Sequence, residues 1–259
     1  MKNRSKNSFN LIIQFLSGAA LLFIVAPLIG MYLRVSPNNF FETSIDPEVA
    51  NSIFLTLWTS MAATLFFSII SIPFAYLLAK KNVPFKNLLN AIIDIPIIIP
   101  HSAAGIAILG LIAKDTIIGK TLAGLGLSFV GTPAGIILAM AFVSVPFVLN
   151  AARDGFESVP AKLENAALNL GASEWQVFFR VSLPLARRSI LSGLILMWAR
   201  GMSEFGAVII VAYNPITTPV LIYERFGAFG LKYSTPVAVV FVTICLLFFA
   251  LFRILGRRK

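Results

Sequence analysis

A positive and a negative side chain, Arg200 and Glu204, lie four residues apart inside an otherwise apolar stretch. Charges within membrane-spanning segments are costly and usually face protein or water, and residues four apart share one face of a helix. The two side chains form an ion pair that fixes helix packing, or they line a pathway in which Arg200 attracts an anion. Gly201, Ser203 and Gly206 are small enough to let another helix approach closely in either case.

A second candidate site is a short segment with two prolines, Pro96 and Pro100, followed by His101 and Ser102. Proline lacks a backbone donor and breaks helices, and membranes tolerate the freed backbone groups only within protein or beside a water-filled cavity. The segment is therefore a packing kink or part of a pathway. His101 is the only histidine of the chain, so we interpret it as a polar group bonded near a helix break and expect no metal site.

Neither segment belongs to a catalytic constellation. The sequence has no phosphate-binding loop motif, no cluster of Cys and His residues, and no pair of carboxylates in a plausible soluble cleft. We therefore expect a chain that is not an enzyme and that holds no cofactor of its own.

The composition points to a membrane protein. Hydrophobic residues make up 58% of the 259 residues and charged residues only 12%, whereas a soluble domain has about 25% charged residues. A helical span needs about 20 mainly apolar residues, and several such runs are present. The single cysteine, Cys245, excludes an intrachain disulfide.

The elements that must position the candidate residues are six apolar runs. The third run contains both prolines, so we expect it to be kinked or broken. We predict an all-α membrane protein of one domain, residues 1–259, whose spans are Leu11–Leu33, Ile53–Leu78, Leu88–Ala113, Thr132–Ala152, Ile190–Tyr213 and Thr235–Phe252. Between the first four spans, we predict that residues 34–50 and 114–130 form loops.

The positions of Lys and Arg give the orientation, because cytoplasmic loops carry an excess of these residues. With the N-terminus inside, fifteen basic residues fall on the inner side and five on the outer side. The inner ones are Lys2, Arg4, Lys6, Lys80, Lys81, Lys86, Arg153, Lys162, Arg180, Arg187, Arg188, Arg253, Arg257, Arg258 and Lys259; the outer ones are Arg34, Lys114, Lys120, Arg225 and Lys232.

This bias predicts six spans with both termini in the cytoplasm of a cell-membrane protein. It also places the segment 153–184, between spans four and five, on the cytoplasmic side. The net charge of +10 then reflects topology and contact with anionic membrane lipid. We expect no nucleic-acid partner, because no basic patch is interleaved with aromatic residues.

The segment 153–184 is amphipathic and predicts two short helices. Ser158 is placed to cap a helix that begins at Val159 and Pro160, and Gly171 can end that helix with a positive φ. A small apolar face at helical spacing consists of Leu163, Ala166, Ala167 and Leu170.

The second short helix opens with Ser173 and Gln176, which are spaced for a capping box. Pro184 is expected to limit this helix. On pattern alone, the whole segment is equally compatible with an ordinary loop between two spans.

The spacing of the segment resembles the cytoplasmic "EAA" loop of ABC importer permeases. That pattern is Glu-Ala-Ala, three residues, Gly, nine residues, then Ile-x-Leu-Pro. Here Ala166, Ala167 and Gly171 match it, Val181 replaces Ile, and Asn165 stands at the position of the motif's Glu. The resemblance implies a coupling loop that docks into an ATP-hydrolysing subunit through Glu164, Asn165, Ala166, Ala167, Gly171, Ala172 and Pro184.

Two other segments narrow the resemblance. Residues 200–215 with 221–226, and residues 99–105, are similar to those of archaeal tungstate/molybdate permeases, and the likeness covers most of the chain from Leu88 to Phe226. Sulfate permeases share the loop and a Glu-Phe-Gly sequence like that at residues 204–206. The residues assigned to a translocation path or to packing are Pro96, Pro100, His101, Ser102, Arg200, Ser203, Glu204 and Gly206.

The resemblance implies the membrane subunit of an ATP-driven importer for a tetrahedral oxyanion, tungstate or molybdate. It further implies a homodimer, two cytoplasmic ABC ATPase subunits that bind ATP and Mg, and an extracytoplasmic oxyanion-binding protein. The alternatives are a sulfate or thiosulfate ABC permease, a secondary transporter, and a membrane-embedded scaffold or sensor.

Overall fold

The computed structural model describes residues 2–257, with side chains from residue 9 to residue 251. Arg258 and Lys259, two of the basic residues assigned to the inner side, lie outside the described residues. Within that range the chain is all-helical. The helices are α1 (Lys2–Leu33), α2 (Pro37–Ile45), α3 (Pro47–Lys80), α4 (Lys86–Ile98), α5 (His101–Ile112), α6 (Ile117–Gly124), α7 (Pro133–Glu157), α8 (Ala161–Asn169), α9 (Glu174–Val177), η1 (Phe178–Ser182), α10 (Leu183–Met202), α11 (Gly206–Val211), α12 (Thr218–Phe229) and α13 (Leu231–Arg257).

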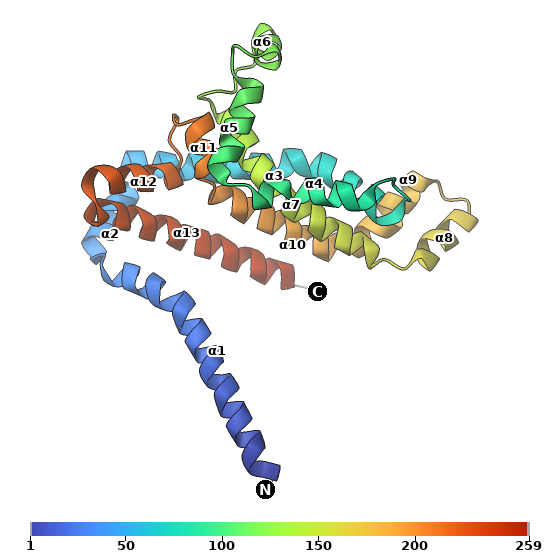
Figure 1. Cartoon of the computed structure of the whole chain (residues 1–259), viewed down its shortest axis with the longest axis horizontal. Coiled ribbons are helices and arrows are strands. Elements are labelled where there is room, and N and C mark those ends of the chain that lie inside the picture. The colour runs from blue at the N-terminus through green and yellow to red at the C-terminus, as the bar shows by residue number, and fades with distance from the viewer. Residues whose placement is uncertain (1, 258–259) are drawn as a thin grey trace.

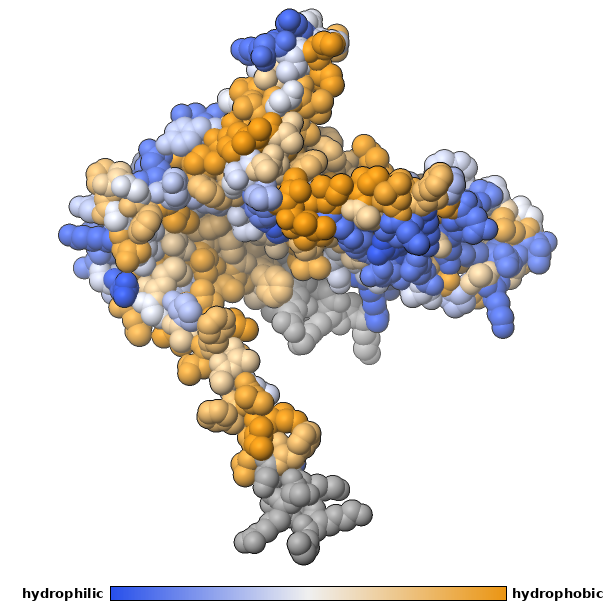
Figure 2. Space-filling model, in the orientation of Figure 1, coloured by the Kyte–Doolittle hydropathy of each residue, from blue (hydrophilic) through white to orange (hydrophobic). Residues whose placement is uncertain are grey.

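Five helical segments are long and apolar enough to cross a membrane, and the bent pair α4 and α5 makes a sixth if it counts as one span. The α1 helix extends away from the other helices in Figure 1, and none of its most apolar window is buried. Figure 2 shows hydrophobic residues along α1 and across the middle of the molecule, and hydrophilic residues toward the end with α8 and α9. The predicted all-α membrane class agrees with this architecture.

The centre of the molecule is formed by α3, α7 and α10, which pack against one another. Small residues allow this close packing. A Cβ added at Gly193 of α10 would lie 2.7 Å from Ala151 Cβ of α7, and one at Gly155 of α7 would lie 2.7 Å from Ser189 Cβ of α10. Buried hydroxyls on α3 are satisfied within the helix: Thr64 Oγ1, for example, donates to the Ser60 carbonyl at 2.8 Å.

The predicted third span is broken, as its prolines indicated. The chain bends by 109° between α4 and α5, and Pro100 lies at the break, immediately before α5. Pro96 lies within α4 and does not interrupt it. Of the two prolines, only Pro100 therefore ends a helix.

The predicted fifth span, Ile190–Tyr213, is wrong at its C-terminal end. The α10 helix stops at Met202, and a separate short helix, α11, follows at Gly206. Glu204 Oε1 accepts a hydrogen bond from the Ala207 N–H at 2.9 Å, which satisfies a donor in the first turn of α11 and favours a new helix start there. Arg200 is thus in the last turn of one helix, and Glu204 lies between two helices.

Two predicted loops contain helices. Residues 34–50 include α2 and the start of α3, because Ser36 and Asp46 cap these helices and Pro37 and Pro47 follow at first-turn positions. Residues 114–130 include α6, which is capped by Thr116.

Much of the predicted segment 153–184 belongs to two longer helices. The α7 helix continues to Glu157, and α9, η1 and α10 form one helical stretch from Glu174 to Met202. The intervening residues, 158–173, are called the α7–α9 loop below. Pro184 does not end the second helix, because a π-turn in which the Leu183 N–H bonds to the Phe178 carbonyl carries the chain past it.

The caps predicted for this loop are partly right. Ser158 belongs to the end of α7, where its hydroxyl donates to the Gly155 carbonyl, and α8 begins at Ala161 without a side-chain cap. Gly171 has a φ of 88° and follows α8 as predicted. The capping box of Ser173 and Gln176 is present at the start of α9.

Candidate functional site

A buried carboxylate, Glu204, joins the two helix breaks of the membrane domain. The Glu204 side chain is fully buried, and its Oε2 lies 2.9 Å from Arg200 Nη2 and 3.1 Å from His101 Nδ1. Arg200 Nη2 also lies 2.9 and 2.7 Å from the two ring nitrogens of His101. The three side chains, called the Glu204 cluster below, thus connect the end of α10 with the start of α5.

The backbone makes room for this cluster. A Cβ on Gly206 would lie only 2.8 Å from His101 Cβ, so α11 and α5 approach as closely as they do because residue 206 is glycine. The structure therefore brings together five of the eight residues predicted for packing or for a pathway. They are His101, Arg200, Ser203, Glu204 and Gly206, with Arg200 Nη1 donating to Ser203 Oγ at 3.3 Å.

The remaining residues of that set lie around the α4–α5 break. Pro100 immediately precedes His101, the Ser102 side chain is exposed, and Pro96 lies one turn earlier in α4. Pro100 contributes to the site through the helix break, because the break makes His101 the first residue of α5.

The chemistry open to the Glu204 cluster is electrostatic. Both carboxylate oxygens of Glu204 are occupied, which satisfies the buried charge. The Arg200 and His101 side chains are 20% and 40% exposed, so the cationic side of the cluster is partly accessible whereas Glu204 is not. Among the described residues, no group of three or more His, Cys, Asp or Glu side chains is placed to hold a metal ion.

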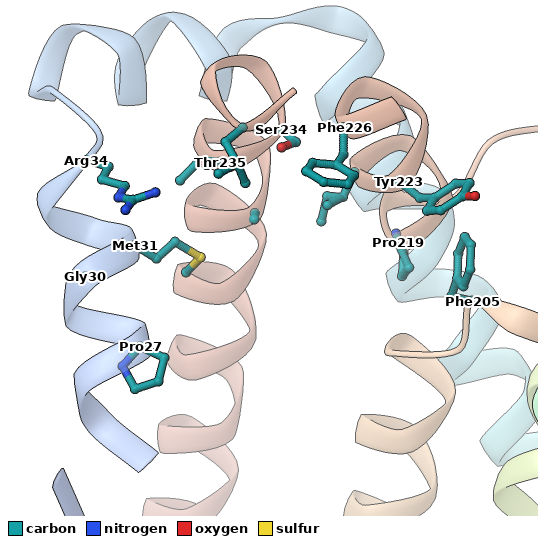
Figure 3. A pocket seen from close by; sticks show the side chains of 13 residues that line it. Pro27, Gly30, Met31, Arg34, Phe205, Pro219, Tyr223, Phe226, Ser234 and Thr235 are labelled. Atoms are coloured by element: carbon teal, nitrogen blue, oxygen red, sulfur yellow. The ribbon is translucent and has the colours of Figure 1, made fainter. Parts of the chain in front are cut away.

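A separate cavity of about 580 Å³ lies between α1, α12 and α13. Figure 3 shows Arg34, which follows the end of α1, together with Phe226 and Tyr223 of α12, among the residues that line it. Arg34 is the charged residue in a mainly apolar lining. The Glu204 cluster is not part of this cavity, although the neighbouring Phe205 is.

The second candidate site is the α7–α9 loop. The predicted apolar face of α8 is accessible: Leu163 is 48% and Leu170 89% exposed, Ala166 is exposed and Ala167 half-buried. Asn165 and Gly171 are also exposed, Ala172 is half-buried, and Pro184 is exposed on α10.

Glu164, in contrast, faces inward. Its Oε2 lies 3.0 Å from Lys80 Nζ at the end of α3, and its Oε1 accepts a 2.6 Å hydrogen bond from Ser182 Oγ in η1. Sequence reasoning missed Lys80 and Ser182 as members of this site. The available signal is the Lys80–Lys81 pair directly after a span, which by itself indicates only the topology.

Ion pairs connect segments that the charge bias had assigned to the same side. Lys80, Lys81 and Lys86 pair with Glu164, Glu174 and Glu157, respectively, at the end that carries α8 and α9. At the opposite end, where Figure 1 places α2 and α12, Arg225 pairs with Asp46 and Glu48 at 2.8 and 2.6 Å.

The contact with Arg225 affects the acidity of Asp46. The hydrogen bond from the guanidinium holds the pKa of the Asp46 carboxyl below its usual range, more than partial burial raises it. The carboxylate form is thereby favoured, and α12 stays joined to the start of α3.

Comparison with known proteins gives the family. Residues 71–259 match the family model described as "Binding-protein-dependent transport system inner membrane component". The chain is 41% identical, over 92% of both chains, to a molybdate/tungstate transport system permease protein of Thermococcus kodakarensis. It is 30% identical to the sulfate transport system permease protein CysT of Escherichia coli, over 89% of this chain and 87% of that one.

The fold agrees with this family. The crystal structure of a bacterial ABC transporter involved in the import of the acidic polysaccharide alginate superposes with a TM-score of 0.77 at 18% identity, covering 98% of this chain and 96% of that one. The fold, the family match and the level of identity lead to one conclusion. The chain belongs to the binding-protein-dependent transport system inner membrane components, the non-catalytic, multi-pass permease subunits of ABC importers.

Proposed function

We propose that this permease translocates a tetrahedral oxyanion, tungstate or molybdate. The observation that carries this proposal is the 41% identity over 92% of a molybdate/tungstate permease, against 30% for a sulfate permease. Sulfate, a smaller tetrahedral dianion, is the second candidate because the chain also covers most of that relative.

The transport complex would contain two copies of this chain, two cytoplasmic ABC ATPase subunits and an extracytoplasmic oxyanion-binding protein. The ATPase subunits would bind ATP and Mg. Support for the ATPase contact is the accessible apolar face of α8, with Leu163, Ala166 and Leu170 exposed on a segment that the charge bias places in the cytoplasm. Closure of the ATPase subunits on ATP would move this face and switch the pathway from inward-facing to outward-facing.

For the Glu204 cluster, we propose a role in packing. The short distances from Glu204 to Arg200 and His101, and its full burial, favour a satisfied charge that holds the two helix breaks together. The competing role, in which Arg200 lines the path and attracts the dianion, is supported by the partial exposure of Arg200 and His101.

The substrate is tested by ATP hydrolysis in the purified complex, with the binding protein loaded in turn with tungstate, molybdate and sulfate. We expect tungstate or molybdate to stimulate hydrolysis and sulfate to leave it at the basal rate. Stimulation by sulfate alone would assign the chain to the second candidate. A secondary transporter, by comparison, would work from an ion gradient and would not respond to ATP.

A further inference from the structure

The α7–α9 loop is joined to two membrane helices through one buried carboxylate. Glu164 Oε2 lies 3.0 Å from Lys80 Nζ at the end of α3, and Glu164 Oε1 accepts a hydrogen bond from Ser182 Oγ at 2.6 Å. Lys80 Nζ also donates to the Val159 carbonyl at 2.6 Å, just before α8. Any displacement of α8 must therefore carry these contacts along or break them.

Lys80, Glu164 and Ser182, called the Glu164 cluster below, are more buried than the ion pairs around them. The side chains of Lys80 and Glu164 are 13% and 10% exposed, and Ser182 is fully buried. The neighbouring pair Lys81–Glu174 joins the same end of α3 to α9, but its side chains are 50% and 74% exposed. Exposed pairs contribute little and tolerate movement, whereas a buried pair that loses one partner leaves an uncompensated charge.

The Glu164 cluster also lies near one end of the long helical stretch that contains α10. From Glu174 the helical stretch runs without interruption to Met202. At 1.5 Å per residue, Ser182 is about 27 Å along the helix from Arg200. The α3 helix, on the other side of Glu164, packs against both α7 and α10. Movement at Glu164 is thus connected through continuous helix to the Glu204 cluster.

We propose that Lys80, Glu164 and Ser182 form the link that passes movement of α8 to α3 and α10 during transport. Glu164 is a positioning residue in this proposal: Leu163 and Ala166 meet the ATPase, and Glu164 holds α8 to the helices that must move. The inference rests on the proposed function, because it requires an ATPase subunit that displaces α8.

The test uses the full complex in vesicles, with a tungstate-loaded binding protein, and measures tungstate taken up per ATP hydrolysed. Glu164→Gln leaves the exposed face of α8 unchanged, so the ATPase should co-purify normally. Tungstate uptake per ATP hydrolysed should fall about fivefold or more, because coupling between two sites in a protein typically changes equilibria by at least that factor. The matched control is Glu174→Gln, which removes the exposed pair with Lys81 and should behave like the unmodified protein.

A second variant separates linkage from stability. In Lys80→Met combined with Glu164→Gln, no lone buried charge remains, so the melting temperature should recover relative to Glu164→Gln. Uptake per ATP should stay low, because the contact between α3 and α8 is still absent. Recovery of uptake together with stability would overturn the proposal, as would unmodified uptake per ATP in Glu164→Gln. Absence of tungstate-stimulated hydrolysis in the unmodified complex would contradict the proposed function instead.

Discussion

Glu204 is the residue on which the arrangement of the two helix breaks depends. It contacts Arg200 at the end of α10, His101 at the start of α5 and the first turn of α11. A buried ionised side chain is stable only when it is paired and hydrogen-bonded. The three contacts meet this requirement, and they tie a local charge to the relative position of three helices.

Removal of either partner of the Arg200–Glu204 pair should lower stability by roughly 3–5 kcal/mol, because a lone buried charge remains. Arg200→Ala and Glu204→Ala should each lower the melting temperature, and the double variant should recover part of the loss. A double-mutant cycle in melting temperature, run beside tungstate uptake, measures this. If both single variants keep normal stability and only Arg200→Ala loses uptake, Arg200 lines the permeation path and the packing role is wrong.

The Asp46–Arg225 contact should make stability depend on acid pH. An unpaired aspartate has a pKa of about 3.9, and the folded protein lowers that of Asp46. The Asp46–Arg225 contact therefore contributes fully to the free energy of unfolding above about pH 4. This contribution is lost as the pH falls through the lower pKa that Asp46 has in the folded protein. For such a partly exposed pair it should be at most about 1 kcal/mol.

Thermal unfolding between pH 3 and pH 6 tests this. Asp46→Asn should be less stable than the unmodified protein at pH 6, and the difference should narrow toward pH 3. Glu42→Gln serves as the control, because Glu42 is exposed on the neighbouring α2. A constant difference across the whole range would show that Asp46 contributes without its charge.

At the scale of elements, the sequence predicted helices well where one physical signal dominated. Long apolar runs located the segments that became α1, α3, α7 and α13, and positive φ at Gly171 followed from its place after an amphipathic stretch. The end of α10 could not be predicted, because apolar residues continue to Tyr213 and the hydrogen bond from the Ala207 N–H to Glu204 Oε1 leaves no mark on that pattern.

The burial of Glu164 was likewise beyond sequence reasoning. Its neighbour Asn165 has a similar polarity and is exposed. What separates them is the position of Lys80, 84 residues away in the chain, and of Ser182 on a π-turn. Contacts over such separations depend on tertiary packing and leave no local pattern.

The exposed face of α8 should bind the ATPase subunit. Ala166→Arg places a long charged side chain on the face with Leu163 and Leu170, so co-purification of the ATPase should drop sharply without loss of the membrane fold. Ala161→Arg adds the same charge at the exposed first position of the same helix, on the side opposite that face at 3.6 residues per turn, and serves as the control. Equal yields of ATPase with both variants would mean that this face is not the contact.

For the whole molecule, the charge bias remains a prediction about sides of the membrane. The ion pairs place the predicted inner segments together at one end and the predicted outer segments together at the other. This grouping agrees with the assignment of these loops to two sides.

Labelling of engineered cysteines in intact cells determines the orientation. In a Cys245→Ser background, an impermeant reagent should label Asn39→Cys and Lys232→Cys but not Lys81→Cys or Lys162→Cys. Labelling of these four positions after permeabilisation controls for accessibility. Modification of Lys162→Cys from outside would reverse the topology and remove the basis for ATPase contact at α8.

The most direct test of the central claim is uptake of radiolabelled tungstate by vesicles that contain this chain with its ATPase subunits. Uptake should require the binding protein on one side and ATP on the other, and unlabelled molybdate should compete while sulfate at the same concentration should not. Uptake that persists without ATP, driven by an ion gradient, or that sulfate alone abolishes, would contradict the account of this chain as the permease of an ATP-driven tungstate or molybdate importer.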